Sequence, residues 1–487
     1  MRGSGIPTAD NGDHFHSRRP TAKGRPMLAI DSRCGDRNSR RSTCRSTAIP
    51  TRKDTMTQSL GFDFGTTNSV LAAVEHGKTR AIDFDSPAGR YDTMRTALSF
   101  MKHPNLGAQA LQIEAGQAAI RTFIDNPGDA RFLQSIKTFA ASPLFQGTLI
   151  FARRNGFEDL MRAFVARLKD YAGDAWPVDG TRIVVGRPVR YAGANPDDNL
   201  ALERYQTALG SFGFSDIRYV YEPVAAAFYF AQTLKQDATV LVADFGGGTT
   251  DYSLIRFETH AGVLSATPIG HSGVGIAGDH FDFRIIDNLV SPLIGKGTQF
   301  RSFDKVLDVP SGYYANFGRW NQLSIFKTLK DFADLKQLVR SSLEPEKLEA
   351  FIDLIEHDEG YPLYQAVSAT KMRLSAEEET EFFFAPLGER SRKIVRRADF
   401  EQWIAPELGR IESALDEVLE KTNTAAGAVD KVFLTGGTSF VPAVRRMFER
   451  RFDTARIESG GELLSIAHGL ALIGARDDID LWTAAAN

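Results

Sequence analysis

The stretch Leu60–Glu75, LGFDFGTTNSVLAAVE, decides the fold expected for this chain of 487 residues. Its apolar run, Gly/Thr turn and second alternating run are typical of a β-hairpin. The pattern returns at Val240–Arg256, VLVADFGGGTTDYSLIR, and the two Asp-Phe-Gly triplets begin at Asp63 and Asp244, 181 positions apart. Two similar hairpins at the separation of a domain predict two related lobes, each placing one acidic turn at a shared cleft.

The residues of both turns suit phosphate binding. Glycines let backbone N–H groups approach phosphate oxygens, and Thr hydroxyls add donors. An Asp at a strand end can hold a hydrated Mg²⁺. A single Asp-Phe-Gly is most often only a tight turn, so the prediction of a nucleotide site rests on the pair.

A third Gly/Thr turn follows later in the chain. Lys431–Leu434, KVFL, predicts a strand that runs into Thr435–Ser439, TGGTS, and a helix is expected to begin near Pro442. The amides at the start of that helix would point back toward the Gly pair. An ordinary strand-to-helix loop explains this segment equally well by itself, but a third turn of the same composition fits the same ligand.

Other nucleotide and hydrolase motifs are rejected. Gly273–Gly278, GVGIAG, satisfies GxGxxG, yet the residues that follow offer no next strand ending in an acidic residue, as a Rossmann unit requires. Gly77-Lys78-Thr79 has the ending of a phosphate loop, but Ala72 stands where that motif needs Gly. The sequence contains neither a GxSxG elbow nor paired His ligands.

Composition predicts a soluble cytoplasmic body that binds neither nucleic acid nor membrane. The chain is 43% apolar and 24% charged, and no apolar run approaches the roughly 18 residues of a spanning helix. Residues 1–55 carry a formal charge of +7, which leaves −10 on residues 56–487 and no electrostatic reason to expect DNA or RNA binding. Cys34 and Cys44 both lie in the basic segment, so disulfides and thiolate metal sites are excluded from the rest.

Residues 1–58 are expected to be a disordered basic tail, because they show neither helical nor strand periodicity. The tail lacks the apolar core of a secretory signal, and its five Asp argue against a transit peptide. A nucleic-acid tether is one alternative. The favoured interpretation is upstream translated sequence without a role, since Met56 stands immediately before the first predicted strand.

Five segments together resemble a known family. The segments GFDFGTTNSV, YEPVAAAFYFA, VADFGGGTTDYSL, AGDHFDFR and FLTGGTSFVP are similar to the ATPase motifs of DnaK-type 70-kDa heat-shock chaperones, over nearly all of residues 59–475. Ile183–Val189, IVVGRPV, most resembles the YegD-type branch. The resemblance implies an α/β, actin-like ATPase fold of two lobes, each a mixed β-sheet flanked by helices. Lobe I would comprise 59–235 with a returning segment 461–480, and lobe II would comprise 236–460.

The resemblance also implies roles for individual residues. Asp63 and Asp244 would face one Mg²⁺, through water. Asp244 would belong to a catalytic set with Lys137, Glu222 and Asp251. Lys137 would orient the attacking water and neutralise phosphate charge, Glu222 would assist the water or the metal, and Asp251 would help to polarise the water. Lys137 could equally be a solvated surface charge, and Glu222 an ordinary acidic residue at a helix start. The phosphates would lie between two groups of residues: Gly65, Thr66, Thr67 and Asn68 from the first turn, and Gly246, Gly247, Gly248, Thr249 and Thr250 from the second.

The adenosine side departs from the family pattern. Ser368 and Met372 stand where typical members carry Glu and Arg, and Phe440 replaces an Arg that would stack on adenine. A Phe can stack on a base as well, so ATP is the expected ligand and GTP stays open. Lys371 and Ser375 fit the family's ribose and adenine helix. Gly278, Gly436, Gly437 and Thr438 complete the residues expected to bind the nucleotide.

Two further regions carry expectations. After Ala475 twelve residues remain, so the family's peptide-binding domain, which needs well over about 100 residues, is not expected. Leu323–Ile355 shows helical periodicity that fits core packing, whereas the aromatic segment Gly312–Trp320 could belong to a partner surface.

The sequence therefore predicts a slow, Mg²⁺-dependent cytoplasmic ATPase with lobe closure as its output. ATP and ADP are the expected ligands, and protein clients or co-chaperones the expected partners. A non-hydrolysing nucleotide switch or scaffold, a small-molecule kinase of the same fold and a filament-forming protein are the alternatives.

Overall fold

The computed structural model describes residues 59–483, except 76, 103–109, 127, 178–179, 194, 215, 261–262, 316–325, 327–329 and 461–463. The chain divides into two units at Asp54. The expected disordered tail 1–58, with Cys34 and Cys44, lies outside the described residues and stays a prediction, as do Asn316–Trp320 of the aromatic segment.

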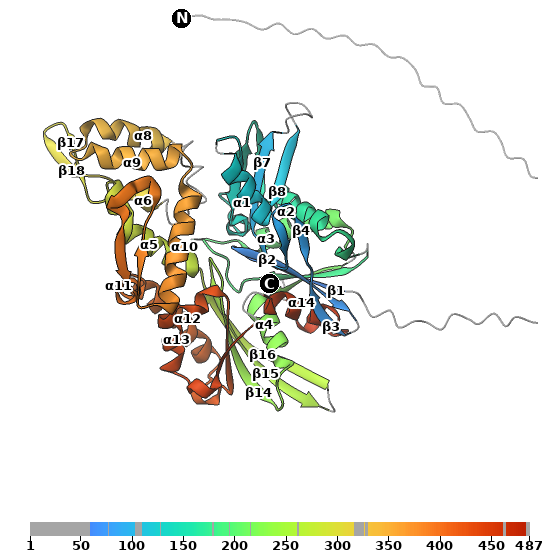
Figure 1. The fold of residues 1–487 in the computed structure, drawn as a ribbon. Helices are drawn as coiled ribbons and strands as arrows, with labels where there is room; N and C mark the ends of the chain where they lie inside the picture. The colour runs from blue at the N-terminus through green and yellow to red at the C-terminus, as the bar shows by residue number, and fades with distance from the viewer. Residues whose placement is uncertain are drawn as a thin grey trace, which may run out of the picture. The chain divides into compact units, whose positions relative to one another are not determined.

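The first sheet is built around the first predicted hairpin (Figure 1). Its strand order is β13-β12-β1-β2-β3, with β1 and β2 antiparallel and β12 and β13 parallel to β1. All six residues of β1 are buried, as is typical of a central strand covered on both faces. The strands are β1 (Ser59–Phe64), β2 (Asn68–Glu75), β3 (Lys78–Ala81), β12 (Arg182–Arg187) and β13 (Asp216–Tyr221), and the short β6 (Met94–Arg95) also pairs with β2.

The second sheet repeats this arrangement around the second hairpin. Its order is β16-β15-β14-β21-β22, again with an antiparallel hairpin, a third antiparallel strand beside it and two parallel strands on the other side. The strands are β14 (Ala238–Phe245), β15 (Thr250–His260), β16 (Val263–Val274), β21 (Lys431–Thr435) and β22 (Ile457–Ser459). Both predicted hairpins are confirmed, and two sheets of one topology in one chain match the expected actin-like ATPase fold.

Two helices rich in small residues lie between the sheets, as Figure 1 shows. They are α4 (Glu222–Ala231) and α14 (Ser465–Gly474). A Cβ on Gly469 would lie 1.8 Å from the carbonyl oxygen of Ala225, and one on Gly61 of β1 would lie 2.1 Å from that of Ala467. Glycine is therefore required where α14 crosses α4 and where it crosses β1.

The first sheet is covered by helices and by a second, smaller sheet of order β8-β7-β9. One apolar core joins these elements, from Leu60 and Phe64 to Phe164 and Tyr205. The elements are β4 (Phe84–Ser86), β5 (Gly89–Tyr91), β7 (Ala97–Lys102), β8 (Leu111–Ala115), α1 (Gly116–Asp125), β9 (Arg131–Gln134), β10 (Thr148–Ile150), β11 (Arg153–Asn155), α2 (Phe157–Ala172) and α3 (Asp198–Leu209).

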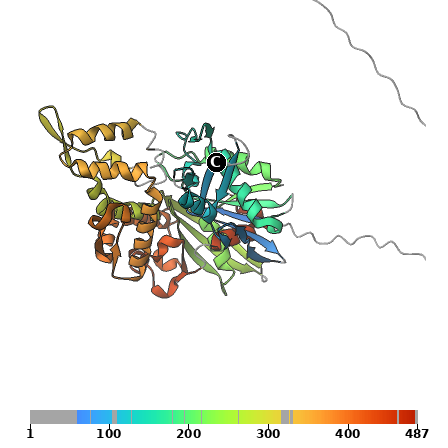
Figure 2. The ribbon, with the colours of Figure 1, turned by 45° about the horizontal axis from the view of Figure 1, so that its top comes forward.

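The second sheet carries more helices and a projecting hairpin. Figures 1 and 2 both show β17, β18, α8 and α9 at the end of this part of the chain farthest from α14. The elements are α5 (Gly278–Leu289), β17 (Gln299–Ser302), β18 (Lys305–Asp308), α6 (Gly312–Ala315), α8 (Lys330–Leu338), α9 (Pro345–Glu356), α10 (Gly360–Ala376), β19 (Glu379–Phe382), β20 (Lys393–Arg396), α11 (Arg397–Trp403), α12 (Ala405–Lys421) and α13 (Pro442–Glu449).

Within the described part of Leu323–Ile355, α8 and α9 account for the predicted helical periodicity. The chain leaves the helical conformation between α8 and α9, where Pro345 starts the second helix. Leu335, Leu348 and Phe351 are fully buried, which confirms core packing for the described part of this stretch.

Candidate functional site

The two hairpin turns touch each other. A Cβ on Gly247 of the second turn would lie 2.4 Å from Thr67 Oγ1 of the first, and one on Gly248 would lie 3.5 Å from Thr66 Oγ1. A side chain at position 247 would therefore force the Thr67 side chain to move. The structure thus brings the two predicted phosphate-binding turns into contact.

The first turn is fixed by a residue that belongs to none of the sequence motifs. Thr96 donates its hydroxyl to the carbonyl of Gly65 at 2.7 Å, and its backbone N–H to the carbonyl of Thr67 at 2.9 Å. Thr96 is fully buried and directly follows β6. Sequence reasoning missed it because the contact spans 31 residues and depends on the pairing of β6 with β2.

The second turn is held by the start of α5 and by the third Gly/Thr turn. The carbonyl of Gly246 accepts from the N–H of Gly278 at 3.4 Å and from Thr438 Oγ1 at 3.2 Å. The carbonyl of Gly247 accepts from the N–H of Asp279 at 2.8 Å. The structure thus places Gly278 and Thr438 at this turn.

Close packing also fixes the third turn. Gly436 has a φ of +83°, and a Cβ there would lie 2.1 Å from the carbonyl oxygen of Phe245. A side chain at Gly436 would meet both backbone strain and a clash. A Cβ on the neighbouring Gly437 would meet no atom within 4 Å, so this residue faces open space.

Lys137 and Glu222 form a buried ion pair beside the turns. Lys137 Nζ lies 2.5 Å from Glu222 Oε1, and the residues are 7% and 5% exposed. Lys137 lies in the single helical turn Ile136–Phe139, and Glu222 begins α4 directly after β13. The interpretation of Lys137 as a solvated surface charge is therefore wrong. Burial would lower the pKa of Lys137, but the charges of Glu222 and Asp63 raise it above its usual value.

Three aspartates share this buried environment. Burial, the charge of Glu222 and the charge of Asp244 raise the pKa of Asp63 well above its usual value. Burial and the charges of Glu222 and Asp251 do the same to the pKa of Asp244. Carboxylates that oppose one another's ionisation in this way form a place where a divalent cation would be stabilised.

The geometry of the acids suits a hydrated cation. Among the described residues, no three His, Cys, Asp or Glu side chains converge closely enough to hold a metal ion by themselves. Mg²⁺ characteristically keeps several of its waters and binds through one or two carboxylates plus phosphate oxygens. Asp63 and Asp244 therefore fit Mg²⁺ held through water.

Asp251 links the two sheets. Its Oδ1 accepts from the backbone N–H of Val189 at 2.9 Å and of Arg190 at 3.2 Å, both in the loop after β12. Burial and the charge of Glu222 raise the pKa of Asp251 to about 7, although the hydrogen bond from Arg190 acts to lower it. The side chain expected to polarise water thus also fastens the first part of the chain to the second.

The residues expected on the adenosine side lie on α10 and at the end of the third turn. Lys371 Nζ donates to Asp282 Oδ2 at 2.9 Å and to the carbonyl of Gly278 at 3.3 Å. Ser375 Oγ donates to the carbonyl of Lys371, one turn earlier in α10, at 3.1 Å. Phe440 is 57% exposed, which leaves its ring available to a base. The role of these residues toward a nucleoside stays a prediction.

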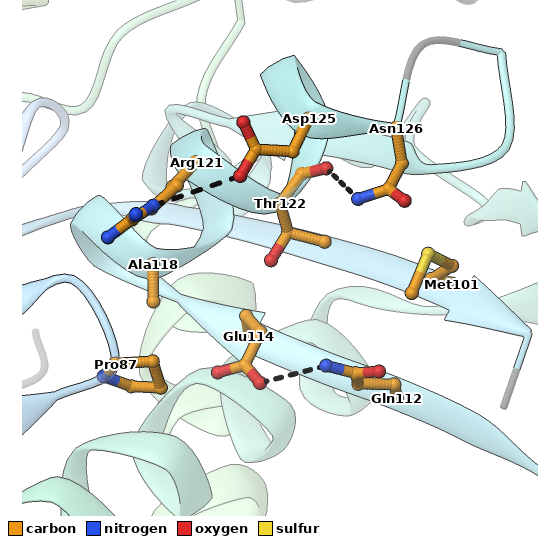
Figure 3. Close-up of a pocket in the computed structure, with 9 residues that line it drawn as sticks. All are labelled: Pro87, Met101, Gln112, Glu114, Ala118, Arg121, Thr122, Asp125 and Asn126. Atoms are coloured by element: carbon orange, nitrogen blue, oxygen red, sulfur yellow. Dashed lines mark hydrogen bonds and ion pairs between the residues drawn. The ribbon is translucent and has the colours of Figure 1, made fainter.

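A cavity of about 410 Å³ lies elsewhere, against β7, β8 and α1 (Figure 3). In Figure 3 the side chains of Glu114 and Gln112 lie on one wall, and those of Arg121 and Asp125 on the other. None of the predicted nucleotide residues lines this cavity. The candidate site is therefore defined by the meeting of the turns and the buried charges.

Comparison with known families assigns the chain. The family model described as "Hsp70 protein" matches residues 204–302 and 336–475, which include the second hairpin turn, the start of α5 and the third turn. The chain belongs to the Hsp70 family. No comparison bears on the finer resemblance to the YegD-type branch, which stays a prediction.

Several curated relatives extend the match. Chaperone protein DnaK of Mycoplasmopsis pulmonis is 24% identical over 396 residues, which are 80% of this chain and 53% of that protein. Chaperone protein DnaK of Deinococcus deserti and that of Deinococcus radiodurans are each 26% identical over 433 and 436 residues, covering 86% of this chain and 59% of each relative. The chain thus spans little more than half the length of these Hsp70 relatives.

Within the part of the chain that the structure describes, no helix combines the length and the apolar character needed to cross a bilayer.

The buried carboxylates predict a pH effect on stability. The pKa of Asp251 is raised to about 7 by burial and by Glu222, so the folded state binds this proton more tightly than the unfolded chain, where the usual value is 3.8. Its contribution to the free energy of unfolding is therefore lost as pH rises toward 7, at up to about 1.4 kcal/mol per pH unit. In Asp251→Asn the side-chain oxygen can still accept hydrogen bonds from the backbone N–H groups of Val189 and Arg190, but the side chain no longer titrates.

Urea unfolding of the wild type and of Asp251→Asn at pH 5, 6, 7 and 8 measures this effect. We expect the variant to gain stability relative to the wild type by about 2 kcal/mol or more between pH 5 and pH 7, and little further above pH 7. A difference that is independent of pH, or that shrinks as pH rises, contradicts the assignment. Taking the difference cancels the titration of His271 and His468, whose pKa values burial lowers.

Proposed function

We propose that this Hsp70-family chain binds Mg-ATP between its two hairpin turns and hydrolyses it slowly. The observation that carries the proposal is the buried Lys137–Glu222 ion pair among the aspartates at the point where the two turns meet. Catalytic sites typically contain buried carboxylates that shift one another's pKa values, together with a lysine. Burying these charges only for structural reasons would lower the stability of the fold.

The turns would bind the triphosphate. The first group, Gly65 to Asn68, and the second, Gly246 to Thr250, offer backbone amides and Thr hydroxyls from the two facing sheets. Mg²⁺, when bound, would neutralise charge on the β- and γ-phosphates. Asp63 and Asp244 would hold the waters of the ion. Gly436 and Gly437 would face the α-phosphate side, with Phe440 against the base.

The buried ion pair would act on the attacking water. Lys137, held by Glu222, would orient the water and oppose the charge of the phosphoryl group, while Glu222 would accept a hydrogen bond from the same water. Asp251 would be a further hydrogen-bond acceptor for this water. Phosphoryl transfer depends mainly on such positioning and charge stabilisation, so few residues suffice.

Lobe closure would be the conformational output, with 59–235 and 461–480 as one lobe and 236–460 as the other. An apolar cluster that joins the two supports this proposal. Phe132 of β9 lies 5.3 Å from Tyr361 of α10 between ring centroids, and Tyr361, Tyr364 and Ala97 are buried in the same cluster. Protein clients or co-chaperones would bind the closed state in the cytoplasm.

Tyr361→Ala is expected to accelerate nucleotide release. Removing this ring takes away the edge-on contact with Phe132 and part of the buried area that holds the proposed lobes together, so ADP dissociation should speed up by about tenfold. Stopped-flow release of a fluorescent ADP measures the rate. Phe303→Ala, at the fully exposed tip of the β17–β18 hairpin, is the matched control and should leave it unchanged. Equal rates for Tyr361→Ala and the wild type would contradict closure through this cluster.

Phosphate release by the full chain tests the proposed function. The wild type is compared with Asp244→Asn at matched nucleotide occupancy, established by calorimetry. Activity in the wild type that the variant loses supports hydrolysis in this site. Binding without turnover in the wild type would make the chain a nucleotide switch, and absence of binding would overturn the proposal altogether.

A further inference from the structure

A buried arginine lies close to the proposed catalytic residues and has no part in the proposed hydrolysis. Arg187 is the last residue of β12 and is 4% exposed. The next residue, Pro188, disfavours a helical conformation at Arg187 and carries no N–H group, so the strand ends here. A buried guanidinium group is unfavourable unless its charge is compensated, so the contacts of Arg187 show what holds it in place.

Three contacts surround the guanidinium group. Its Nη2 donates to Asp198 Oδ2 at 2.5 Å, and Asp198 is the first residue of α3. Its Cζ lies 5.0 Å from the ring centroid of Tyr221 and 5.8 Å from that of Tyr191. Its Nε is buried and has no hydrogen-bond partner among the described residues, so the carboxylate and the two rings supply the compensation.

The contact with Tyr221 acts on Glu222. Tyr221 is the last residue of β13, and Glu222 follows it directly as the first residue of α4. The parallel pairing of β12 and β13 sets Arg187 opposite Tyr221, and a Cβ on the preceding Gly186 would lie 3.0 Å from Glu222 Cγ. The end of β12 therefore packs against the side chain that pairs with Lys137, and Arg187 fixes the backbone that carries it.

The contact with Tyr191 acts on Asp251. Arg187 and Tyr191 are the two ends of the loop after β12, and their contact holds these ends together. Between them, the N–H groups of Val189 and Arg190 donate to Asp251 Oδ1 at 2.9 and 3.2 Å. Arg187 thus also fixes the loop that holds Asp251.

We infer that Arg187, held by Asp198, is a positioning residue for the hydrolysis of ATP. It fixes the backbone that carries Glu222 and the two amides that hold Asp251. The inference rests on the proposed function, in which both acids act on the attacking water. Among the described residues, the ion pair and ring contacts of Arg187 involve neither phosphate turn, so its loss should slow the chemical step and leave nucleotide affinity unchanged.

The experiment separates rate from affinity in the full chain. Single-turnover phosphate release at matched occupancy gives the rate, and calorimetry with a non-hydrolysable ATP analogue and Mg²⁺ gives the affinity. Arg187→Met fills the space without the charge and should slow hydrolysis by about tenfold or more, with affinity within about twofold of the wild type. Arg187→Lys keeps a positive charge and should recover part of the rate. Asp198→Asn removes only the ion pair and should slow hydrolysis by about threefold.

Arg182→Met is the matched control. Arg182 begins β12, and its Nε lies 3.0 Å from Asp216 Oδ2 at the start of β13. This variant removes the same kind of ion pair at the opposite end of the strand, so it should lower the melting temperature and leave the rate unchanged. Circular dichroism shows whether Arg187→Met is folded, and if it is not, Asp198→Asn, whose side chain is 42% exposed, carries the test.

Each outcome decides the inference. A wild-type rate in Arg187→Met, or a loss of rate with an equal loss of affinity, overturns it. An equal loss of rate in Arg182→Met also overturns it, because the effect would then reflect stability alone. Where Asp198→Asn carries the test, an unchanged rate overturns it. If the wild type does not hydrolyse ATP, the proposed function fails and the inference falls with it, whereas wild-type hydrolysis with unaltered variants contradicts the inference alone.

Discussion

Lys137→Ala is expected to reduce phosphate release from ATP by at least about 100-fold at saturating nucleotide, the usual effect of removing a group aimed at transition-state charge. The side chain is 7% exposed and paired with Glu222, and a water that filled its place would supply no positive charge. Single-turnover phosphate release, measured at equal nucleotide occupancy, isolates the chemical step from binding.

A loss of stability must be separated from a loss of chemistry. Lys137→Ala also leaves Glu222 buried without its partner, which typically costs about 3–5 kcal/mol. Lys137→Met with Glu222→Gln removes both charges while filling the space, so it should recover much of the melting temperature and none of the activity. A double variant that regains turnover, or a Lys137→Ala protein with wild-type turnover, would remove Lys137 from the mechanism.

Gly469→Ala is expected to destabilise the protein by about 3 kcal/mol or more, at the upper end of the range for overpacking. Its Cβ would lie 1.8 Å from the carbonyl oxygen of Ala225 and 2.5 Å from the carbonyl carbon. Both atoms belong to the backbone of α4, so no side-chain rotation relieves the clash. The helices α4 and α14 would have to separate, and the core that spans both sheets would lose its packing.

Gly409→Ala is the matched control, because it makes the same chemical change in another helix. A Cβ on Gly409 of α12 would meet no atom within 4 Å. Alanine is the better helix former, so this variant should gain about 0.5–1 kcal/mol. Urea unfolding of both variants measures the two effects. A neutral Gly469→Ala would show that α4 and α14 are not as close as the structure places them.

The parts of the fold that could be predicted from the sequence are those with a local sequence pattern. The Asp-Phe-Gly turns between alternating strands gave both hairpins, because each turn needs glycine and each strand has a period of two. The repetition of the pattern implied two related sheets. The order of the remaining strands was not predicted, because β12 pairs with β1, and β21 with β14, across long separations in the chain.

The candidate site could be predicted where its residues stand next to glycines. Thr438 and Gly278 are in motifs, and the structure places both at the second turn. The roles of the other site residues depend on whether the fold buries them. Whether Lys137 is a surface charge or half of an ion pair depends on Glu222, 85 positions away, and the contact of Thr96 with the first turn has no local signal.

A co-crystal structure with Mg²⁺ and a non-hydrolysable ATP analogue would show directly whether the nucleotide binds between the two hairpin turns. We expect density for the triphosphate between Gly65–Asn68 and Gly246–Thr250, with the metal and its waters beside Asp63 and Asp244. Nucleotide bound elsewhere, such as in the cavity against Glu114 and Arg121, with nothing between the two hairpin turns, would contradict it.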